Sequence, residues 1–139
     1  MMSIFKRNNI DIYIDVVGAI GKGSKFIIYK IKKGNEMNQQ ITDFYVDKTR
    51  NWCILNATTQ ALYSINELYP DCNITIYSNN LYLVNTFNHK WINKWKTNGW
   101  LTTKNTTVKN KELWQEILNL LNGHKSQFKY QKEIEILKF

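Results

Sequence analysis

Apolar and polar positions in the first third of the chain follow the two-residue period of β-strands. Residues 11–17 ("DIYIDVV") form an apolar, β-branched run, and residues 25–34 and 39–48 repeat the pattern. Glycines within 18–23 and at Gly34 supply short turns between these runs. Three adjacent strands joined by such turns predict an antiparallel meander.

From Trp52 the apolar residues recur at spacings of three and four, which predicts an amphipathic helix ending before Pro70. The alternating segment 72–78 predicts a fourth strand. Helical spacing then returns over 79–88 and over 90–99, where a glycine breaks it. The middle of the chain therefore reads as helix, strand, helix, helix.

The last third begins with a polar loop over 102–110. Residues 111–123 have an apolar stripe at helical spacing with Gly123 as a C-cap, and 126–139 is strand-like. This order predicts an α/β fold with helices packed on a mixed sheet. We expect one domain over 1–139, with a core over about 11–131 and with 132–139 extending the last strand or forming a tail.

Charge suggests an anionic partner. Lys and Arg together number 19 against 11 acids, a net charge of +8, and the only arginines are Arg7 and Arg50. Such an excess favours nucleic acid as a partner, although a lysine-rich surface that only keeps the protein in solution stays an alternative. Scarce arginine argues against bidentate reading of bases in a major groove.

The cysteines and histidines do not form a metal-binding motif. Cys53 and Cys72 are far apart without ligand spacing, and we expect both to be reduced packing residues. His89 and His124 have no carboxylate or thiol nearby in sequence, so we expect surface residues. The N-terminus does not resemble a signal peptide and no run is long enough to span a membrane, so we expect an intracellular protein.

The most specific motif is "WINKWKTNGWLTTKNTTVKNKELWQEI", residues 91–117. Its tryptophans, the pair Gly99-Trp100, the Lys/Thr loop and "VKN" before "LWQ" resemble the type 1 ribonuclease H family, and the resemblance extends from Ile12 to about Gln131. It implies an RNase H-like α/β fold: a central mixed five-stranded sheet, three antiparallel strands then parallel additions, with helices on both faces. Because the sequence stops at Phe139, we expect the family's last helix to be missing.

The resemblance also implies that most carboxylates of the family's catalytic site are absent from this sequence. Family members cut the RNA strand of RNA/DNA hybrids with two divalent ions held by several carboxylates. Asp15 matches the first carboxylate, but Ile54 and Asn79 stand where the second and third are expected, and the fourth belongs to the missing helix. The implied protein is a catalytically inactive member with no bound metal or cofactor, in which Asp15 is a vestigial ligand. An active Mg²⁺-dependent ribonuclease H with a rearranged site is the least favoured alternative.

The family's substrate-binding surface is retained in part. Thr49 matches a phosphate-binding threonine, Asn51 an asparagine that touches the substrate backbone, and the helix after residue 90 resembles a protruding basic handle. The candidate nucleic-acid-binding residues are Thr49, Asn51, Trp91, Lys94, Trp95, Lys96, Lys104 and Lys109. Packing in the protein interior is the alternative role for the tryptophans, because their spacing is helical.

Two functions from different classes follow. The first is a noncatalytic module that binds RNA/DNA hybrid or duplex with low sequence specificity. The second is a structural or protein-interaction subunit of a larger nucleic-acid-processing assembly, with a partner at the edge formed by the C-terminal strand. A viral or mobile-element origin is compatible with either, because reverse transcriptases carry both active and degenerate RNase H domains.

Overall fold

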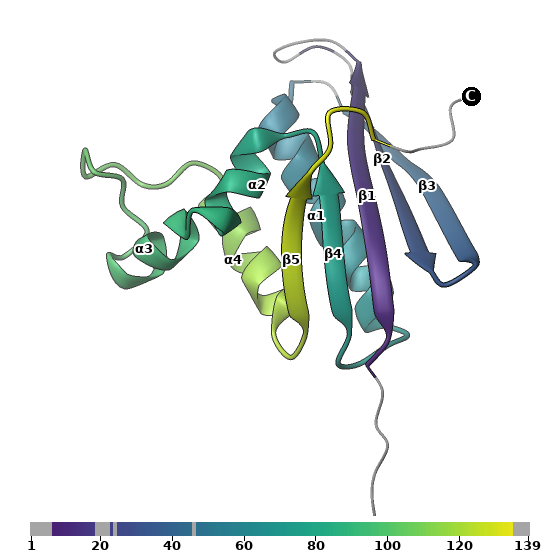
Figure 1. Cartoon of the computed structure of the whole chain (residues 1–139). Helices are drawn as coiled ribbons and strands as arrows, with labels where there is room; N and C mark the ends of the chain where they lie inside the picture. The colour runs from purple at the N-terminus through teal and green to yellow at the C-terminus, as the bar shows by residue number, and fades with distance from the viewer. Residues whose placement is uncertain (1–6, 19–22, 24, 46, 135–139) are drawn as a thin grey trace, which may run out of the picture.

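The computed structural model describes residues 7–18, 23, 25–45 and 47–134, with the backbone alone over 39–44. A five-stranded sheet runs through the molecule in the order β3-β2-β1-β4-β5 (Figure 1). The strands are β1 (Asn9–Gly18), β2 (Lys25–Lys33), β3 (Glu36–Tyr45), β4 (Asn73–Ser78) and β5 (Lys125–Tyr130). The helices are α1 (Arg50–Asn66), α2 (Leu81–Asn88), α3 (Trp91–Thr97) and α4 (Lys111–Leu121).

The strand pairing confirms the mixed sheet expected from the sequence. β1, β2 and β3 form an antiparallel meander, and β4 pairs with β1, and β5 with β4, in parallel. The parallel pairs need crossovers, which α1 supplies before β4 and the segment from α2 to α4 supplies before β5. β1 is therefore the central strand.

The hydrophobic core lies between the sheet and α1. Alternate residues of β1, namely Ile10, Ile12, Ile14 and Val16, are 3% exposed or less and point to the helical side. Leu55, Leu62 and Ile65 of α1 are buried against them at helical spacing. The apolar residues at strand spacing in β1 and at helical spacing in α1 thus pack against each other in one core.

The expected placement of helices on both faces is not what the described residues show. α1 packs on β1 and β2, α2 packs on β4 and β5, and α4 packs on α1, all on one side of the sheet (Figure 1). We call the other side the open face; its residues on the three parallel strands are Asn9, Asp11, Tyr13, Asp15, Val17, Asn73, Thr75, Tyr77, Lys125, Gln127 and Lys129. Polar side chains alternate there with few apolar ones, so much of this face tolerates water.

The remaining connections agree with the sequence reading. α3 and the loop 98–110 protrude from the body of the molecule at the left of Figure 1, and we call this unit the handle.

β5 ends at Tyr130, residues 131–134 form no strand, and the rest of the expected tail lies outside the described residues. Of the short Gly-Lys-Gly turn only Gly23 is described. No helix in the described ranges has the length and apolar character needed to cross a membrane.

Candidate nucleic-acid interface and degenerate metal centre

The strand register brings Asp15 and Asn79 together. Ile14 pairs with Ser78, so the next residue of each strand lies at the same end of the sheet. Asp15 Oδ1 accepts a hydrogen bond from the backbone N–H of Val16 at 2.8 Å and lies 3.5 Å from Asn79 Nδ2. The amide donor partly offsets the charge of a half-buried carboxylate. Asn79 thus occupies the position expected from the sequence but acts as a donor toward Asp15.

Ile54 lies in the core. It is 1% exposed on the buried side of α1, in the cluster with Leu55 and Ile12. An aliphatic side chain offers no donor to a metal ion, and a neutral asparagine amide brings no charge. No group of three or more His, Cys, Asp or Glu side chains able to hold a metal occurs in the described ranges. The side chains beside Asp15 therefore do not fit a two-ion centre.

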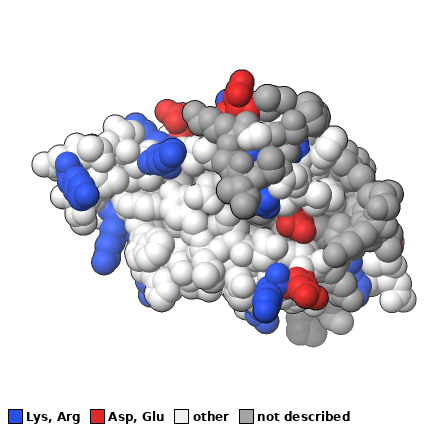
Figure 2. All heavy atoms as spheres, turned by 90° about the horizontal axis from the view of Figure 1, so that it is seen from above, with Lys and Arg blue, Asp and Glu red and all other residues white. Residues whose placement is uncertain are grey.

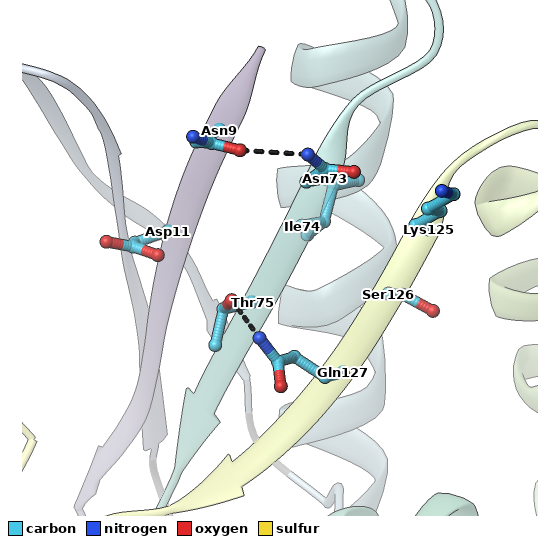
Figure 3. A pocket seen from close by; sticks show the side chains of 8 residues that line it. All are labelled: Asn9, Asp11, Asn73, Ile74, Thr75, Lys125, Ser126 and Gln127. Carbon is cyan, nitrogen blue, oxygen red and sulfur yellow. Dashed lines mark hydrogen bonds between the residues drawn. The ribbon is translucent and has the colours of Figure 1, made fainter. Parts of the chain in front are cut away.

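Asp11 does not join Asp15 in a rebuilt site. The two residues are four apart on β1, so their Cα atoms are about 13 Å apart. Figure 3 shows Asp11 at the other end of the open face, in a shallow cavity of about 540 Å³ with Asn73, Thr75 and Gln127. The Gln127 amide donates to the Thr75 hydroxyl at 3.1 Å, and Asn73 donates to Asn9 at 2.9 Å. Most amides of this cavity are therefore satisfied within the protein.

Three cations, Arg50, Lys25 and Lys48, lie near the C-terminal end of β1. Arg50 Nη1 donates to the Val16 carbonyl at 2.6 Å and its Nη2 to the Gly18 carbonyl at 3.1 Å. Lys25, fully buried, donates to the carbonyls of Gly23 and Lys48, at 2.9 and 2.8 Å. Positive charge therefore lies at this end of β1 on the helical side of the sheet, whereas the Asp15 side chain is on the open face.

The same three cations act on the thiol of Cys53. Burial raises the pKa of this thiol, and the cations of Lys25, Arg50 and Lys48 oppose the rise. Cys53 and Cys72 are both free and buried, in agreement with the sequence reading.

The sequence analysis missed Lys25, Lys48 and Arg50 as members of this end of the sheet. Lys48 and Arg50 flank Thr49 just ahead of a helix, a signal that could have found these two residues but not Lys25.

Thr49 and Asn51 lie at the start of α1. Thr49 is the N-cap residue, and its hydroxyl oxygen accepts a hydrogen bond from the Trp52 N–H at 3.0 Å. Asn51 Oδ1 accepts from Asn80 Nδ2 at 2.8 Å, and this bond joins α1 to the N-cap of α2. Both side chains therefore have structural partners and sit beside the cations near β1.

The tryptophans divide between packing and exposure. Trp95 lies with ring centroids 5.7 Å from Trp114 and 6.3 Å from Trp100, and Trp114 is fully buried. Trp91 is 38% exposed and stacks on His89 at 5.6 Å. Trp95 therefore braces the handle, whereas Trp91 leaves its ring at the surface.

The lysines predicted from the sequence are all exposed. Figure 2 shows basic side chains spread over the protruding end of the molecule. Lys94 and Lys96 lie in the last turn of α3, and Lys104 and Lys109 follow in the loop. Cations at the end of a helix also interact favourably with its dipole. The handle therefore presents a basic surface without an acid from α3.

His124 is not the free surface residue that the sequence suggested. It follows Gly123 at the start of β5, where its ring is half-buried; Nδ1 accepts a hydrogen bond from the Cys72 N–H at 2.9 Å and Nε2 contacts Asn66 Oδ1. Burial, followed by the nearby Arg7, lowers the pKa of His124, while Asp71 opposes the shift. These partners are more than 50 residues away in sequence, so spacing could not reveal them.

Comparisons with known proteins agree with this fold. A mixed five-stranded sheet with this helix order is an α/β fold, and the family model for RNase H matches residues 8–132. The chain belongs to the ribonuclease H family. A ribonuclease H of Clostridium botulinum is 38% identical over 93 residues, covering 67% of this chain and 60% of that protein. The chain thus spans about 60% of the length of this relative.

Solved structures share the fold at low sequence identity. LC9-RNase H1, a type 1 RNase H with the type 2 active-site motif, has a TM-score of 0.76 at 17% identity, covering 94% of this chain and 65% of that one. LC11-RNase H1, solved in complex with an RNA/DNA hybrid, has a TM-score of 0.63 at 15% identity, covering 88% of this chain and 84% of that one. These likenesses support the RNase H-like fold.

Proposed function

We propose that this chain is a noncatalytic RNase H-like module that binds RNA/DNA hybrid or duplex through its backbone. The observation that carries the proposal is the end of β1, where Asn79 donates toward Asp15 and where Arg50 donates to the carbonyls of Val16 and Gly18. A two-ion reaction needs clustered carboxylates, whereas the side-chain neighbour of Asp15 is the amide of Asn79. The exposed Lys48 and the half-buried Arg50, which flank Thr49, are the cations that a phosphate can approach there.

A second basic surface supports backbone binding. The exposed lysines of the handle lie on α3 and the loop after it, whereas Arg50 begins α1, so the proposal assigns phosphate contacts to two separate elements. Lysine contacts to phosphates carry little sequence information, which fits the low specificity expected. A ribonuclease H structure of the same fold was solved in complex with a hybrid, which makes the hybrid the first ligand to test.

The decisive experiment follows cleavage and binding together. Purified protein is incubated with labelled RNA/DNA hybrid in Mg²⁺, Mn²⁺ or EDTA, and products and mobility are read from parallel gels. We expect retardation that is the same in EDTA, without cleavage. Cleavage that is lost in Asp15→Asn would contradict the noncatalytic function and support the rearranged-site alternative. No retardation of hybrid or duplex at low salt would contradict the binding function.

One observation favours a protein partner as the second candidate function. Val17 and Phe26 pair across β1 and β2 on the open face, and they are 49% and 44% exposed. Two neighbouring exposed apolar side chains are a small but suitable contact surface for another protein. Val17→Ser together with Phe26→Ser should leave hybrid retardation unchanged if this surface serves a protein partner.

A further inference from the structure

A cavity between the handle and α4 has the chemistry of a nucleobase site. It has a volume of about 390 Å³ and is lined by Lys96, Trp100, Gln115, Leu118, Asn119 and Asn122. We call it the α3–α4 pocket. Its lining combines one aromatic ring, one aliphatic side chain, three amides and one cation. This volume is within the range of small-ligand sites and holds a single planar ring.

The amides of this pocket are accessible to solvent: Asn119 and Asn122 are exposed and Gln115 is half-buried. The side chains of Gln115, Asn119 and Asn122 make no hydrogen bond to another described residue. By contrast, the amides of Asn66 and Asn88 donate to the carbonyls of Leu120 and Phe128, at 3.0 and 3.1 Å. The cavity of Figure 3 differs too, because its amides bond to one another and no aromatic ring lines it.

The spacing along α4 explains why these amides face one direction. Gln115, Leu118 and Asn119 are three and one residues apart, which places them on one stripe of the helix, and Asn122 is the C-cap residue that follows it. The opposite stripe, with Trp114, Ile117 and Leu121, is buried in the core. The amide stripe is therefore the outward side of α4, and it faces Trp100 across the pocket.

Trp100 is held in place by strained backbone. Its φ is +63°, an uncommon value for a bulky residue. Its N–H donates to the Trp95 carbonyl at 2.7 Å, and its carbonyl accepts from the Val108 N–H at 2.9 Å. The Trp95 ring lies against it at 6.3 Å. Strain that is maintained by several contacts is common at ligand sites.

We infer that the α3–α4 pocket binds one unpaired nucleobase of a single-stranded nucleic acid. The Trp100 ring offers a stacking surface, the amides offer paired donors and acceptors to a base edge, and Lys96 offers a cation to the adjoining phosphate. A base in a duplex has both faces and its pairing edge occupied, so the site selects a single strand or an overhang. This inference rests on the proposed nucleic-acid-binding function and adds a subsite to it.

The test compares single-stranded and duplex ligands in matched variants. Fluorescein-labelled 12-residue RNA and DNA single strands, and a fully paired hybrid, are titrated by anisotropy. The variants are Gln115→Ala/Asn119→Ala, Trp100→Ala, and the control Asn93→Ala, an exposed amide on α3 outside the pocket. We expect the double variant and Trp100→Ala each to weaken single-strand binding about tenfold, with Asn93→Ala and hybrid binding unchanged.

Folding and location are checked separately. Alanine is favourable in a helix, so the double variant should unfold at the same denaturant concentration as the wild type even if Trp100→Ala does not. A single strand carrying 4-thiouridine should crosslink under ultraviolet light to the peptide that contains Trp100. Wild-type affinity in the double variant, or no single-strand binding by the wild type, would overturn the inference. Hybrid retardation in those cases would leave the proposed function intact.

Discussion

Asn79 is the side-chain neighbour of Asp15 at this end of the sheet. Changing it to Asp places a second carboxylate about 3.5 Å from Asp15. Like charges this close repel, so we expect Asn79→Asp to lower the free energy of unfolding by about 1 kcal/mol in EDTA. Millimolar Mn²⁺ should restore that loss, because two carboxylates can share the ion.

The control for this prediction is Asn79→Ala, which removes the donor without adding charge. Its unfolding should not respond to Mn²⁺. Thermal unfolding followed by circular dichroism, with and without Mn²⁺, makes the measurement. A manganese response of equal size in Asn79→Ala would show that the ion binds elsewhere.

Lys48 supplies a second prediction at the residue scale. Its Nζ lies 4.7 Å from the Trp52 ring, beside the candidate interface, whereas Lys33 Nζ lies 5.2 Å from the Tyr69 ring at the other end of β2. Lys48→Ala should weaken hybrid binding and lower the slope of log K against log salt by about 0.9, the loss of one phosphate contact. Lys33→Ala removes the same charge and a similar ring contact, and its slope should match the wild type.

His124 connects protonation to stability. The folded pKa lies below the ordinary value of 6.5, so the unfolded chain binds the proton more readily. Stability from this residue is therefore complete above pH 6.5 and is lost as the pH falls toward the lowered folded pKa. Urea unfolding at pH 7.5 and at pH 5 measures the loss. In His124→Gln the difference between the two pH values should shrink.

The same bonds assign the tautomer of His124. Because the Cys72 N–H donates to Nδ1, the neutral ring carries its proton on Nε2, which donates to Asn66 Oδ1. At pH 7.5 the variant loses the Cys72 bond and should be less stable by about 1 kcal/mol. Equal pH dependence in variant and wild type would assign the effect to another group.

At the scale of elements, α1 depends on its cap. Thr49 accepts the bond from the Trp52 N–H, which would otherwise lack a partner in the first turn. Thr49→Ala should cost about 1 kcal/mol of unfolding free energy, measured in urea, and Thr49→Ser should cost much less. A phosphate contact by the same hydroxyl would appear as weaker hybrid binding in Thr49→Ala at a salt concentration where both variants are folded.

The elements themselves were largely predictable from the sequence. Apolar residues recur every two positions over 11–17 and about every 3.6 positions from Trp52. Such patterns can be read from neighbouring residues alone, and the structure has β1 and α1 there. The cluster of Lys25, Lys48 and Arg50 was not predictable in this way, because it requires the register of β1 and β2 and the position of the loop before α1. Residue identity showed that Ile54 and Asn79 are not carboxylates, but not that Asn79 donates toward Asp15.

The open face illustrates the limit of reasoning from a family resemblance. The resemblance led us to expect helices on both sides, yet the residues of the parallel strands already carry a different pattern. Tyr13 and Tyr77 stack at 4.7 Å, and Lys30 Nζ lies 4.7 Å from the Tyr13 ring. Such contacts stabilise a sheet surface without a covering helix. The resemblance therefore predicted the mixed sheet correctly, while the side of the sheet on which the described helices pack required the structure.

At the scale of the whole molecule, the proposed function predicts how two basic regions share one duplex. If the handle contributes phosphate contacts, the triple variant Lys94→Ala/Lys96→Ala/Lys104→Ala should flatten the slope of log K against log salt by up to about 2.7. Lys32→Ala/Lys33→Ala/Lys125→Ala is the matched control, because it also removes three charges from the net +8 but on β2 and β5. Electrophoretic titrations with hybrid between 50 and 200 mM salt measure both slopes. Equal flattening by the two variants would mean that net charge alone attracts the duplex; a change confined to the first would locate the contact on the handle.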